Sequence, residues 1–487
     1  MYDVIIIGGG ISGCSLLYQL SKLQGKFLLL EKENDLSLGS TKANSGIVHA
    51  GYDPLPGTKM AKHNVKGNAM IRDCVKNLSV PFVQTGSLVV AFNEQEKHTL
   101  HELLKRGGQN GVNELSIIQG DALFALEPNL SSNAVAALYA KTTGVIDPWA
   151  LTYAQAECAI LAGAEIELET EVLSIKKFHS DFIISTNKNE YKAKFVVNAA
   201  GVYSDIISQM IENTHFVIKP KNGEYYLLDT TERGIVNTVV FPCPTHLGKG
   251  VLVAPTAHGN IIVGPDAKDC ARDDTSVTTH GLEYVRVRAT KCIPDINLRE
   301  SIRNFTGVRA ISDKDDFIIG ESEQVKGFFN IAGIKSPGLT SAMSFAVEVV
   351  DMLVQAGLSK IYNPNFVDKR KVNRINELQC EEKKDAILQN SLYGNILCRC
   401  RKISEGEVYD ALNRPLPPRS VDAVKRRCTT GMGRCQGAFC VPKIVAMLAD
   451  YWDIDMKDVP QDKVGTYILK KDYRDLYSNK IKPKQQD

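Results

Sequence analysis

The first 31 residues constrain the fold of this chain more strongly than any other stretch. Val4–Ile7 is a short, apolar, β-branched run, which is typical of a strand buried on both faces of a parallel sheet. A G-x-G-x-x-G motif follows, formed by Gly8, Gly10 and Gly13. Ser12–Leu23 then continues with apolar residues at helical spacing, and a second apolar run, Phe27–Leu30, ends in Glu31. This order of strand, glycine turn, helix and strand predicts a dinucleotide-binding βαβ unit.

The glycines and the acid of this unit have separate physical roles. Gly8 allows a tight turn, Gly10 lets the backbone approach a pyrophosphate, and Gly13 lets helix and strand pack closely. A glycine motif by itself could also be a plain structural turn, but here it lies between a strand and a helix. Glu31 can accept both ribose hydroxyls of an adenosine, which argues against a ribose 2′-phosphate. The nucleotide is therefore FAD or NAD rather than NADP.

The composition narrows the class of partner. The chain has 487 residues, enough for two or three domains, and its net charge of +2 gives no reason to expect a nucleic-acid partner. No apolar run approaches membrane-spanning length, so we expect no integral membrane segment. The first strand begins at Asp3, which leaves no room for a targeting peptide. We therefore expect a cytoplasmic protein, with any membrane association peripheral and through a partner.

A loop rich in Gly, Ser and Asn, Leu38–Asp53, follows the second strand, where α/β folds place ligand-binding loops. Hydroxyls for a pyrophosphate and small groups for a flavin ring are expected from Ser40, Thr41, Asn44, Ser45 and Gly46. His49 stands alone among small residues of this loop. A lone histidine can be a purely structural residue, but a neutral imidazole at a ligand loop is a ready proton acceptor near pH 7.

Several motifs resemble one family of flavoproteins. The glycine motif, NSGIVHAGYD and PGTKMAKHNVKGN resemble the D-amino-acid oxidase-like superfamily of FAD oxidoreductases, especially its glycerol-3-phosphate dehydrogenase and 2-hydroxyglutarate oxidase branch. The match continues in GVIDPWAL, FVVNAAGVYSD, GEYYLLD, GKGVLVAPTAHGNIIVGP and AGIKSPGLTSA. The resemblance covers residues 1–360 of the 487 and implies FAD rather than NAD.

The resemblance implies an α/β fold with a discontinuous, Rossmann-like FAD-binding domain and a mostly antiparallel substrate domain. We assign residues 1–85, 146–214 and 313–360 to the first domain, and residues 86–145 and 215–312 to the second. A strand over Glu165–Ile175 would place Val172 against the adenine. Further cofactor contacts are expected from Ile11, Ser12, Lys32, Ala200, Gly201 and Gly333.

The segment after a predicted strand at Gly327–Gly333 is a second candidate for flavin contact. A helix is predicted over Leu339–Val354. Its start presents backbone N–H groups suited to the flavin O2 carbonyl, from Gly338, Leu339 and Thr340. The alternative is a plain strand-to-helix turn.

Three residues are expected on the substrate side of the flavin. Arg309 resembles the family's substrate-anion arginine, and its planar fork suits a carboxylate or a phosphate. Lys249 resembles the position whose ammonium lies near flavin N5, and Tyr225 is a candidate for the same face. The alternative for Arg309 and Lys249 is an ordinary surface charge.

A second cofactor is predicted near the C-terminus. Residues 361–394 form a polar linker with some helix, and the cysteine density then rises sharply. Cys398-x-Cys400 and Cys435-x4-Cys440 resemble the bacterioferritin-associated ferredoxin-like domain, a small helical [2Fe–2S] module over residues 395–453. Zinc is the rival, although its knuckles usually use C-x2–4-C spacing, and inert thiols are the third alternative. Cys428 matches no ligand position, and residues 454–487 are expected to be a surface tail.

These features together predict an FAD-dependent dehydrogenase that oxidises a secondary alcohol on a small anionic substrate. The best single substrate is sn-glycerol 3-phosphate, with His49 as proton acceptor and Arg309 as anion holder. Electrons would leave through the cluster to a second flavoprotein, another acceptor subunit or quinone. The alternatives are an L-2-hydroxyglutarate or amino-acid (proline-type) oxidoreductase of the same fold, or an electron-transfer subunit of a multi-flavin complex.

Overall fold

The computed structural model describes residues 1–244 and 250–470, which form two compact units. The first unit comprises Met1–Lys32 and Leu36–Lys371. The second comprises Glu33–Asp35 and the chain from Val372 onward. None of the helices in these two stretches is both long enough and apolar enough to cross a bilayer.

The first sheet of the first unit is built on four parallel strands. In spatial order these are β2 (Phe27–Leu30), β1 (Tyr2–Ile7), β12 (Glu190–Asn198) and β20 (Phe328–Ala332). The sheet is completed by β9 (Glu165–Glu167), β10 (Val172–Phe178), β11 (Asp181–Thr186) and β19 (Ile318–Glu321). Because the four central strands run the same way, their carboxyl ends lie at one edge of the sheet.

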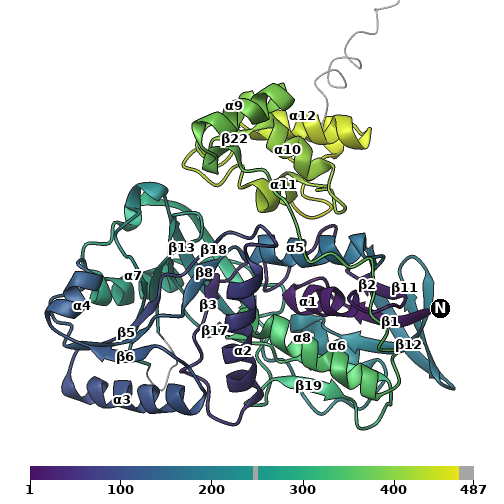
Figure 1. Ribbon diagram of the computed structural model, residues 1–487, viewed down its shortest axis with the longest axis horizontal. Helices are drawn as coiled ribbons and strands as arrows, with labels where there is room; N and C mark the ends of the chain where they lie inside the picture. Colours follow the sequence, from purple (N-terminus) through teal and green to yellow (C-terminus); the bar gives the residue numbers. More distant parts are fainter. Residues whose placement is uncertain (245–249, 471–487) are drawn as a thin grey trace, which may run out of the picture. The chain divides into compact units, whose positions relative to one another are not determined.

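Helices bury the apolar residues of this sheet (Figure 1). α1 (Ile11–Leu20) packs against both α5 (Pro148–Leu161) and α8 (Gly338–Gln355), and α2 (Lys59–Cys74) packs on α8. A short helix, α6 (Ser204–Gln209), contacts β12 and β20. A Cβ atom on Gly13 would lie 2.0 Å from the carbonyl oxygen of Gly8, so only glycine permits this approach of α1 to the turn.

The single strand predicted over Glu165–Ile175 is wrong. The structure divides it into β9 and β10, with an irregular stretch between them in which Glu169 has a φ of 54°. The N–H of Thr170 donates to the carbonyl oxygen of Glu31 at 2.8 Å, which ties this stretch to the end of β2. Alternating apolar residues predicted strand on both sides, but this hydrogen bond to a distant segment is not visible in the sequence.

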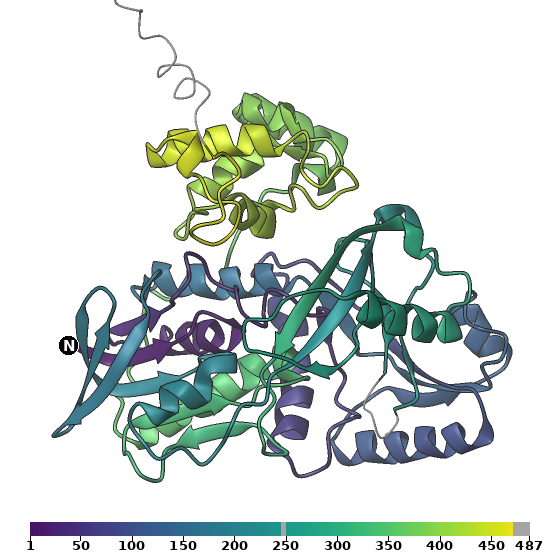
Figure 2. The same ribbon diagram turned by 180° about the vertical axis from the view of Figure 1, so that it is seen from behind.

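The second sheet of the first unit is almost entirely antiparallel, as predicted. Its order is β17 (Lys268–Asp269), β13 (Lys221–Leu228), β16 (Ile261–Gly264), β15 (Leu252–Pro255), β14 (Val239–Pro242), β5 (Ser87–Ala91), β7 (Ala136–Ala140) and β6 (Leu115–Ile118). β18 (Ser301–Arg309) pairs with β13 along its length. Only the β14–β5 pair is parallel. Figure 2 shows this sheet from behind.

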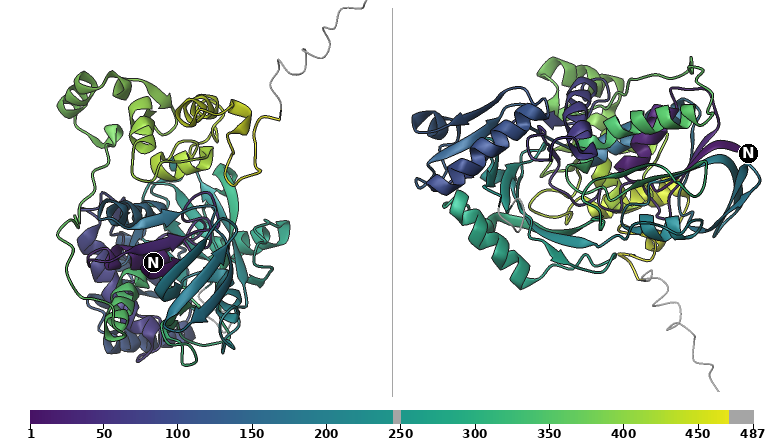
Figure 3. Two further views of the ribbon diagram at one scale, coloured as in Figure 1. Left: turned by 90° about the vertical axis from the view of Figure 1, so that its right-hand side faces the viewer. Right: turned by 90° about the horizontal axis from the view of Figure 1, so that it is seen from below.

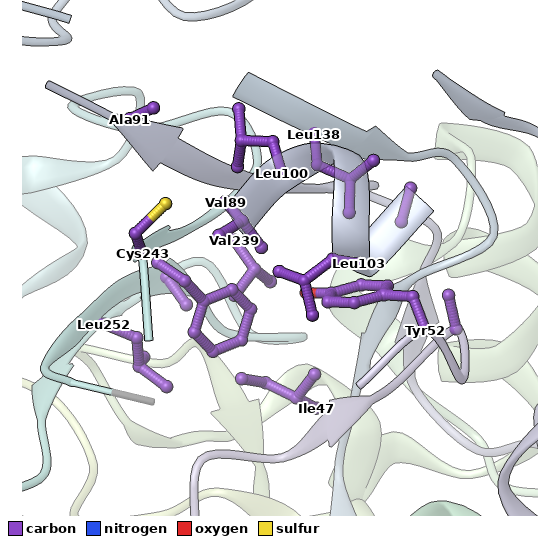
Figure 4. Close-up of a cluster of buried hydrophobic side chains, with 14 of the residues drawn as sticks. Ile47, Tyr52, Val89, Ala91, Leu100, Leu103, Leu138, Val239, Cys243 and Leu252 are labelled. Carbon is purple, nitrogen blue, oxygen red and sulfur yellow. The ribbon is translucent and has the colours of Figure 1, made fainter. Parts of the chain in front are cut away.

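The alternating side chains of β5 serve two separate cores. Val89 and Ala91 pack with residues of α3 (Glu94–Gln109), and Figure 4 shows this cluster. Leu88 and Val90 point to the opposite face and pack with residues of α7 (Thr279–Cys292). The sheet therefore lies between two helices, as the right-hand view of Figure 3 shows. A short helix, α4 (Asp121–Leu126), adds to the α7 side through Leu123.

A small third sheet lies next to the site described below. It consists of β3 (Ile47–Val48), β8 (Gly144–Ile146) and β4 (Phe82–Val83), all antiparallel. His49 directly follows β3, so the pairing of β3 with β8 places the histidine.

The second unit is small and mostly helical. Its elements are α9 (Cys380–Gln389), β21 (Ile396–Cys398), β22 (Ile403–Ser404), α10 (Glu405–Leu412), α11 (Val421–Cys428) and α12 (Val441–Trp452). The start of the expected surface tail packs into this unit. Val459 is 1% exposed, and the carbonyl of Pro460 accepts the N–H of Val421. The polar composition of the segment did not reveal this anchoring.

A buried ion cluster lies within the second unit. The carboxylate of Asp35 accepts hydrogen bonds from Arg426 and Arg427, and Arg426 also pairs with Asp462. Burial alone would raise the pKa of the Asp35 carboxyl, but the guanidinium groups of Arg427 and Arg426 hold it far below its usual range. Asp35 therefore stays ionised, and its negative charge pairs with the buried guanidinium groups of Arg426 and Arg427.

We expect Gly67→Ala to destabilise the first unit by about 1–3 kcal/mol, because a Cβ there would lie 2.0 Å from the carbonyl oxygen of Thr340 and push α2 away from α8. Gly108→Ala is the matched control, since Gly108 is exposed on α3 and no heavy atom lies within 4 Å of its Cβ position. That change should stabilise by about 0.5–1 kcal/mol. Denaturant unfolding of the two variants measures both values. Equal effects would contradict the close packing of α2 on α8.

Candidate active site

The segments predicted to bind FAD meet at one edge of the first sheet. Gly8 follows β1, Glu31 follows β2, Ala200 and Gly201 follow β12, and Gly333 follows β20. These four strands are parallel neighbours, so the segments lie side by side at the carboxyl ends. That edge is where open α/β sheets bind nucleotides.

The glycine turn has the geometry that a dinucleotide requires. Gly8 has a φ of +113°, and its N–H donates to the carbonyl oxygen of Leu30 at 2.8 Å. A Cβ on Gly10 would meet only the hydroxyl of Thr41, at 3.3 Å, so the backbone here is open to a ligand. That hydroxyl accepts the N–H of Ile11 at 3.0 Å, and Ser12 follows in the first turn of α1. The open backbone beside a helix N-terminus fits a pyrophosphate.

The predicted adenosine side is also assembled. Glu31 accepts the N–H of Gly9 at 2.6 Å, which places its carboxylate over the glycine turn. The ammonium of Lys32 lies 3.7 Å from the ring centroid of Tyr203, in the 3₁₀ turn that begins at Gly201. Val172 is buried and packs in the same apolar cluster as residues of β1 and β2. The sheet thus brings together residues that are far apart in the sequence.

The loop that follows β2 is held by its own polar side chains. The amide of Asn44 donates to the carbonyl oxygens of Ser40 and Thr41 and accepts the N–H of Gly46 at 2.8 Å, while Ser45 lies half-buried within the turn. The hydroxyl of Ser40 donates to the carbonyl oxygen of Val308 at 2.6 Å. That hydroxyl therefore joins the loop to β18, whereas the sequence suggested that it would face a pyrophosphate.

The backbone of His49 is held from two helices. Its N–H donates to the hydroxyl of Thr340 at 3.0 Å, and its carbonyl accepts the amides of Asn64 at 2.6 Å and Asn68 at 3.2 Å. Thr340 also donates to the carbonyl of Ile47. These side chains belong to α2 and α8, so hydrogen bonds from both helices fix the main chain of the histidine.

The first turn of α8 offers fewer backbone N–H groups to a flavin carbonyl than the sequence suggested. The N–H of Gly338 donates to the carbonyl oxygen of Lys335 at 2.7 Å. The N–H groups of Leu339 and Thr340 remain the candidates for a flavin carbonyl. Gly333, with a φ of +65°, ends β20 just before this turn.

Two neighbours of the imidazole were missed from the sequence. The hydroxyl of Ser336 lies 3.3 Å from Nε2 of His49, and the ring of Phe241 stacks near the imidazole with centroids 6.1 Å apart. Ser336 lies inside the family motif AGIKSPGLTSA, which was a usable signal. Phe241 comes from β14 of the second sheet, and nothing local in the sequence links it to His49.

Tyr225 and Arg309 lie on neighbouring strands, β13 and β18. Tyr225 stacks on Phe305, its cross-strand partner, with centroids 4.9 Å apart. The guanidinium of Arg309 donates to the carbonyl oxygen of Asp266 at 2.9 Å and also hydrogen-bonds to Tyr225. Burial raises the pKa of the Tyr225 phenol even though Arg309 opposes this, so the phenol stays a hydrogen-bond donor at neutral pH. Lys249 lies outside the described residues.

The guanidinium is placed by a close backbone approach. A Cβ on Gly223 would lie 2.0 Å from Nη2 of Arg309, so the guanidinium lies close against the backbone of β13 at this point. Val308, which holds Ser40, directly precedes Arg309. A Cβ on Gly307 would meet the carbonyl oxygen of Ala43 at 2.0 Å. The candidate anion-binding arginine therefore borders the candidate flavin loop.

The four predicted metal ligands lie as two pairs. The sulfur atoms of Cys400 and Cys435 are 3.4 Å apart, and the thiol of Cys440 hydrogen-bonds to the sulfur of Cys398. No group of three or more His, Cys, Asp or Glu residues in the described part of the chain is arranged to hold one metal ion. Two close pairs of thiols suit a [2Fe–2S] cluster, in which each of two irons takes two thiolates.

The polar contacts of Cys398 favour its thiolate form, which is the form that binds a metal. The hydrogen bond from Cys440 lowers the pKa of Cys398 to about 6 against the effect of burial, with help from the N–H groups of Gly431 and Arg401. Cys428 belongs to neither pair. Its thiol contacts the carbonyl oxygen of Glu407 at 3.5 Å, and burial raises its pKa to about 11.

Comparison with known proteins agrees with both sites. The model of the FAD-dependent oxidoreductase family matches residues 3–352, and that of the BFD-like [2Fe–2S] binding domain matches residues 396–450. A glycerol 3-phosphate dehydrogenase of Caloramator mitchellensis is 45% identical over 96% of this chain and 98% of its own length. An L-2-hydroxyglutarate dehydrogenase of Indibacter alkaliphilus is 32% identical over 72% of this chain and 98% of its own length.

A solved structure shows the same fold. The dithionite-reduced L-α-glycerophosphate oxidase of Mycoplasma pneumoniae, with FAD bound, is 31% identical. It covers 77% of this chain and 99% of its own, with a TM-score of 0.73. The predictions of an FAD-dependent enzyme, of its fold and of a [2Fe–2S] domain are thereby confirmed. The chain belongs to the FAD-dependent oxidoreductase family and carries a BFD-like [2Fe–2S] binding domain in addition.

Proposed function

We propose that this enzyme oxidises sn-glycerol 3-phosphate to dihydroxyacetone phosphate and passes the electrons on through its [2Fe–2S] cluster. The observation that carries the proposal is the 45% identity to a glycerol 3-phosphate dehydrogenase over 96% of the chain, a span that includes both cofactor domains. The relatives that act on L-2-hydroxyglutarate keep that anion as the second candidate.

Each step of the chemistry has a candidate residue in the described structure. Arg309 and Tyr225 would hold the phosphate, because a guanidinium and a neutral phenol are both donors to an anion. The imidazole of His49 would take the proton of the C2 hydroxyl, with Ser336 beside its Nε2. FAD supplies a hydride acceptor when it is bound. Arg309 would thus orient the substrate, and His49 would hold the proton removed from the C2 hydroxyl.

The residues proposed to hold FAD are those of the carboxyl edge and the adjoining loop: Gly8, Gly10, Ile11, Ser12, Gly13, Glu31, Lys32, Ser40, Thr41, Asn44, Ser45, Gly46, Val172, Ala200, Gly201, Gly333, Gly338, Leu339 and Thr340. Cys398, Cys400, Cys435 and Cys440 are proposed to hold the cluster. Lys249 stays a proposal on sequence grounds alone.

The two sheets support the proposed domains of the first unit. The strands of the antiparallel sheet come from residues 87–140 and 221–309, within the proposed substrate domain of residues 86–145 and 215–312. Residues 1–85, 146–214 and 313–360 would bind FAD, and residues 395–453 the cluster. We further propose a cytoplasmic enzyme whose acceptor is a second flavoprotein or another redox subunit. The cytoplasm keeps cysteine thiols reduced, as the four proposed thiolate ligands require, which supports the proposed location.

The proposal is tested by adding sn-glycerol 3-phosphate to the anaerobic holoenzyme and recording its visible spectrum. We expect the flavin absorption to bleach first and the cluster absorption to fall afterwards. L-2-Hydroxyglutarate and L-proline serve as the comparison substrates. Bleaching by either of these, with none by glycerol 3-phosphate, would replace the proposed substrate.

We expect His49→Asn to lower the rate of flavin reduction by about 10²- to 10⁴-fold, because the variant lacks the proton acceptor. FAD content should stay normal, since the hydrogen bonds from the His49 backbone to Thr340 and Asn64 do not involve its ring. His101→Asn, on the exposed face of α3, is the control and should react normally. An unchanged rate in His49→Asn would remove the histidine from the mechanism.

We expect Cys400→Ser to abolish the [2Fe–2S] absorption and lower the bound iron, while substrate still bleaches the flavin. Cys428→Ser is the matched control, because this thiol lies in the same unit but in neither cysteine pair. It should keep two irons per chain. Iron analysis and visible spectra measure both. Loss of iron in the Cys428 variant alone would revise the ligand set.

A further inference from the structure

The two cysteine-bearing loops of the second unit are strongly basic. Between Cys398 and Lys402, and between Cys428 and Lys443, the cations are Arg399, Arg401, Lys402, Arg434 and Lys443, and neither stretch contains an acid. The whole chain, by contrast, is nearly balanced, with 58 basic and 56 acidic residues. We call these five cations together with Phe439 the basic patch.

Three cations of the patch directly adjoin two of the candidate cluster ligands in the chain, since Arg399 and Arg401 flank Cys400 and Arg434 precedes Cys435. Cys398 and Cys440 are each 1% exposed, whereas Cys400 is exposed and Cys435 half-buried. One cysteine pair therefore faces the interior of the unit and the other faces its surface. An electron would have its shortest path to an outside acceptor through the pair of Cys400 and Cys435.

The two loops lie together at this edge. The guanidinium of Arg399, from the first loop, lies 5.9 Å from the ring centroid of Phe439, from the second. Phe439 is 64% exposed, although it is a large apolar side chain. Aromatic residues, phenylalanine included, and arginine are both enriched in protein interfaces. All five cations except the half-buried Arg401 are exposed.

We propose that the basic patch docks the acidic face of a protein that accepts one electron at a time, and that electrons leave through the Cys400–Cys435 edge. In each encounter the reduced cluster is oxidised by one electron and the acceptor centre is reduced by one. Two encounters therefore remove the two electrons that one substrate molecule delivers. The proposal rests on the assignment of the four cysteines as cluster ligands.

A protein fits the patch better than a membrane surface does. Peripheral membrane binding depends on a broad apolar face together with cations, and Phe439 is the only large apolar side chain exposed in the described residues 398–402 and 428–443. An acidic protein surface needs complementary charge, which also speeds encounter. The cations could also act only on the charge of the cluster, and the experiment separates these roles.

The test uses the holoenzyme reduced with dithionite, so that it does not depend on the substrate assignment. Stopped-flow absorbance follows reoxidation of the cluster by ferricyanide, an anion, and by hexaammineruthenium(III), a cation. Arg399→Glu and Lys402→Glu are compared with Lys384→Glu, a control on α9 of the same unit. Poly-L-glutamate, and separately vesicles of anionic lipid, are added as competitors. Iron content and the cluster midpoint potential are measured for every variant.

At low ionic strength, we expect Arg399→Glu and Lys402→Glu to slow reoxidation of the cluster by ferricyanide about tenfold. Reoxidation by hexaammineruthenium(III) should become faster in the same variants. Added salt should remove both effects, and Lys384→Glu should show neither. Poly-L-glutamate should slow the ferricyanide reaction of the wild type and not that of the two variants.

Three results would overturn the proposal. If the reoxidation rates changed equally with both oxidants and the midpoint potential shifted as well, the cations would act on the cluster alone. Competition by vesicles but not by poly-L-glutamate would assign the patch to a membrane. Unchanged reoxidation, with slower electron transfer from flavin to cluster after glycerol 3-phosphate is added, would make the patch part of the internal route. Normal bleaching in that last case would leave the proposed function intact.

Discussion

The alignment of four parallel strands is the constraint on which the candidate flavin site depends. β2, β1, β12 and β20 end together, and the segment after each strand enters the site. The alignment is possible only because backbone replaces side chain at the tightest points. Gly8 lies against the carbonyl of Ala199, and Gly13 against that of Gly8. A methyl group at either glycine would separate the strand from the helix and move the whole edge.

The polar residues of the site divide into those that hold its backbone and those proposed to take part in the chemistry. Several side chains form hydrogen bonds with backbone atoms of neighbouring segments, namely those of Asn44, Ser40 and Thr340. Buried or half-buried polar groups need partners, and a loop rich in small residues has few other ways to hold its shape. This framework places the imidazole of His49, which follows β3 of the small third sheet, and the guanidinium of Arg309, at the end of β18 in the second sheet.

The charged residues of the second unit form a buried ion cluster and a separate, mostly exposed group of cations. Asp35, Arg426 and Arg427 are buried and satisfy one another, so this cluster contributes to the structure. The cations near Cys400 are mostly exposed, and residues 398–402 and 428–443 contain no acid. Sulfur atoms in two close pairs gather negative charge once they bind iron, and backbone N–H groups near Cys398 already favour its thiolate. Nearby cations and N–H groups are suited to hold such charge.

The sequence by itself determined the features that repeat at short range. The βαβ unit, the cofactor types, the cysteine spacing and the antiparallel second sheet all follow from local patterns or family motifs, because period, glycine position and ligand spacing are properties of adjacent residues. Only the tertiary structure decided the break between β9 and β10, the stacking of Phe241 near His49, the tie of Ser40 to Val308 and the anchoring of Val459. Each of these depends on contacts between segments distant along the chain, and no local pattern specifies which distant backbone group a side chain will meet.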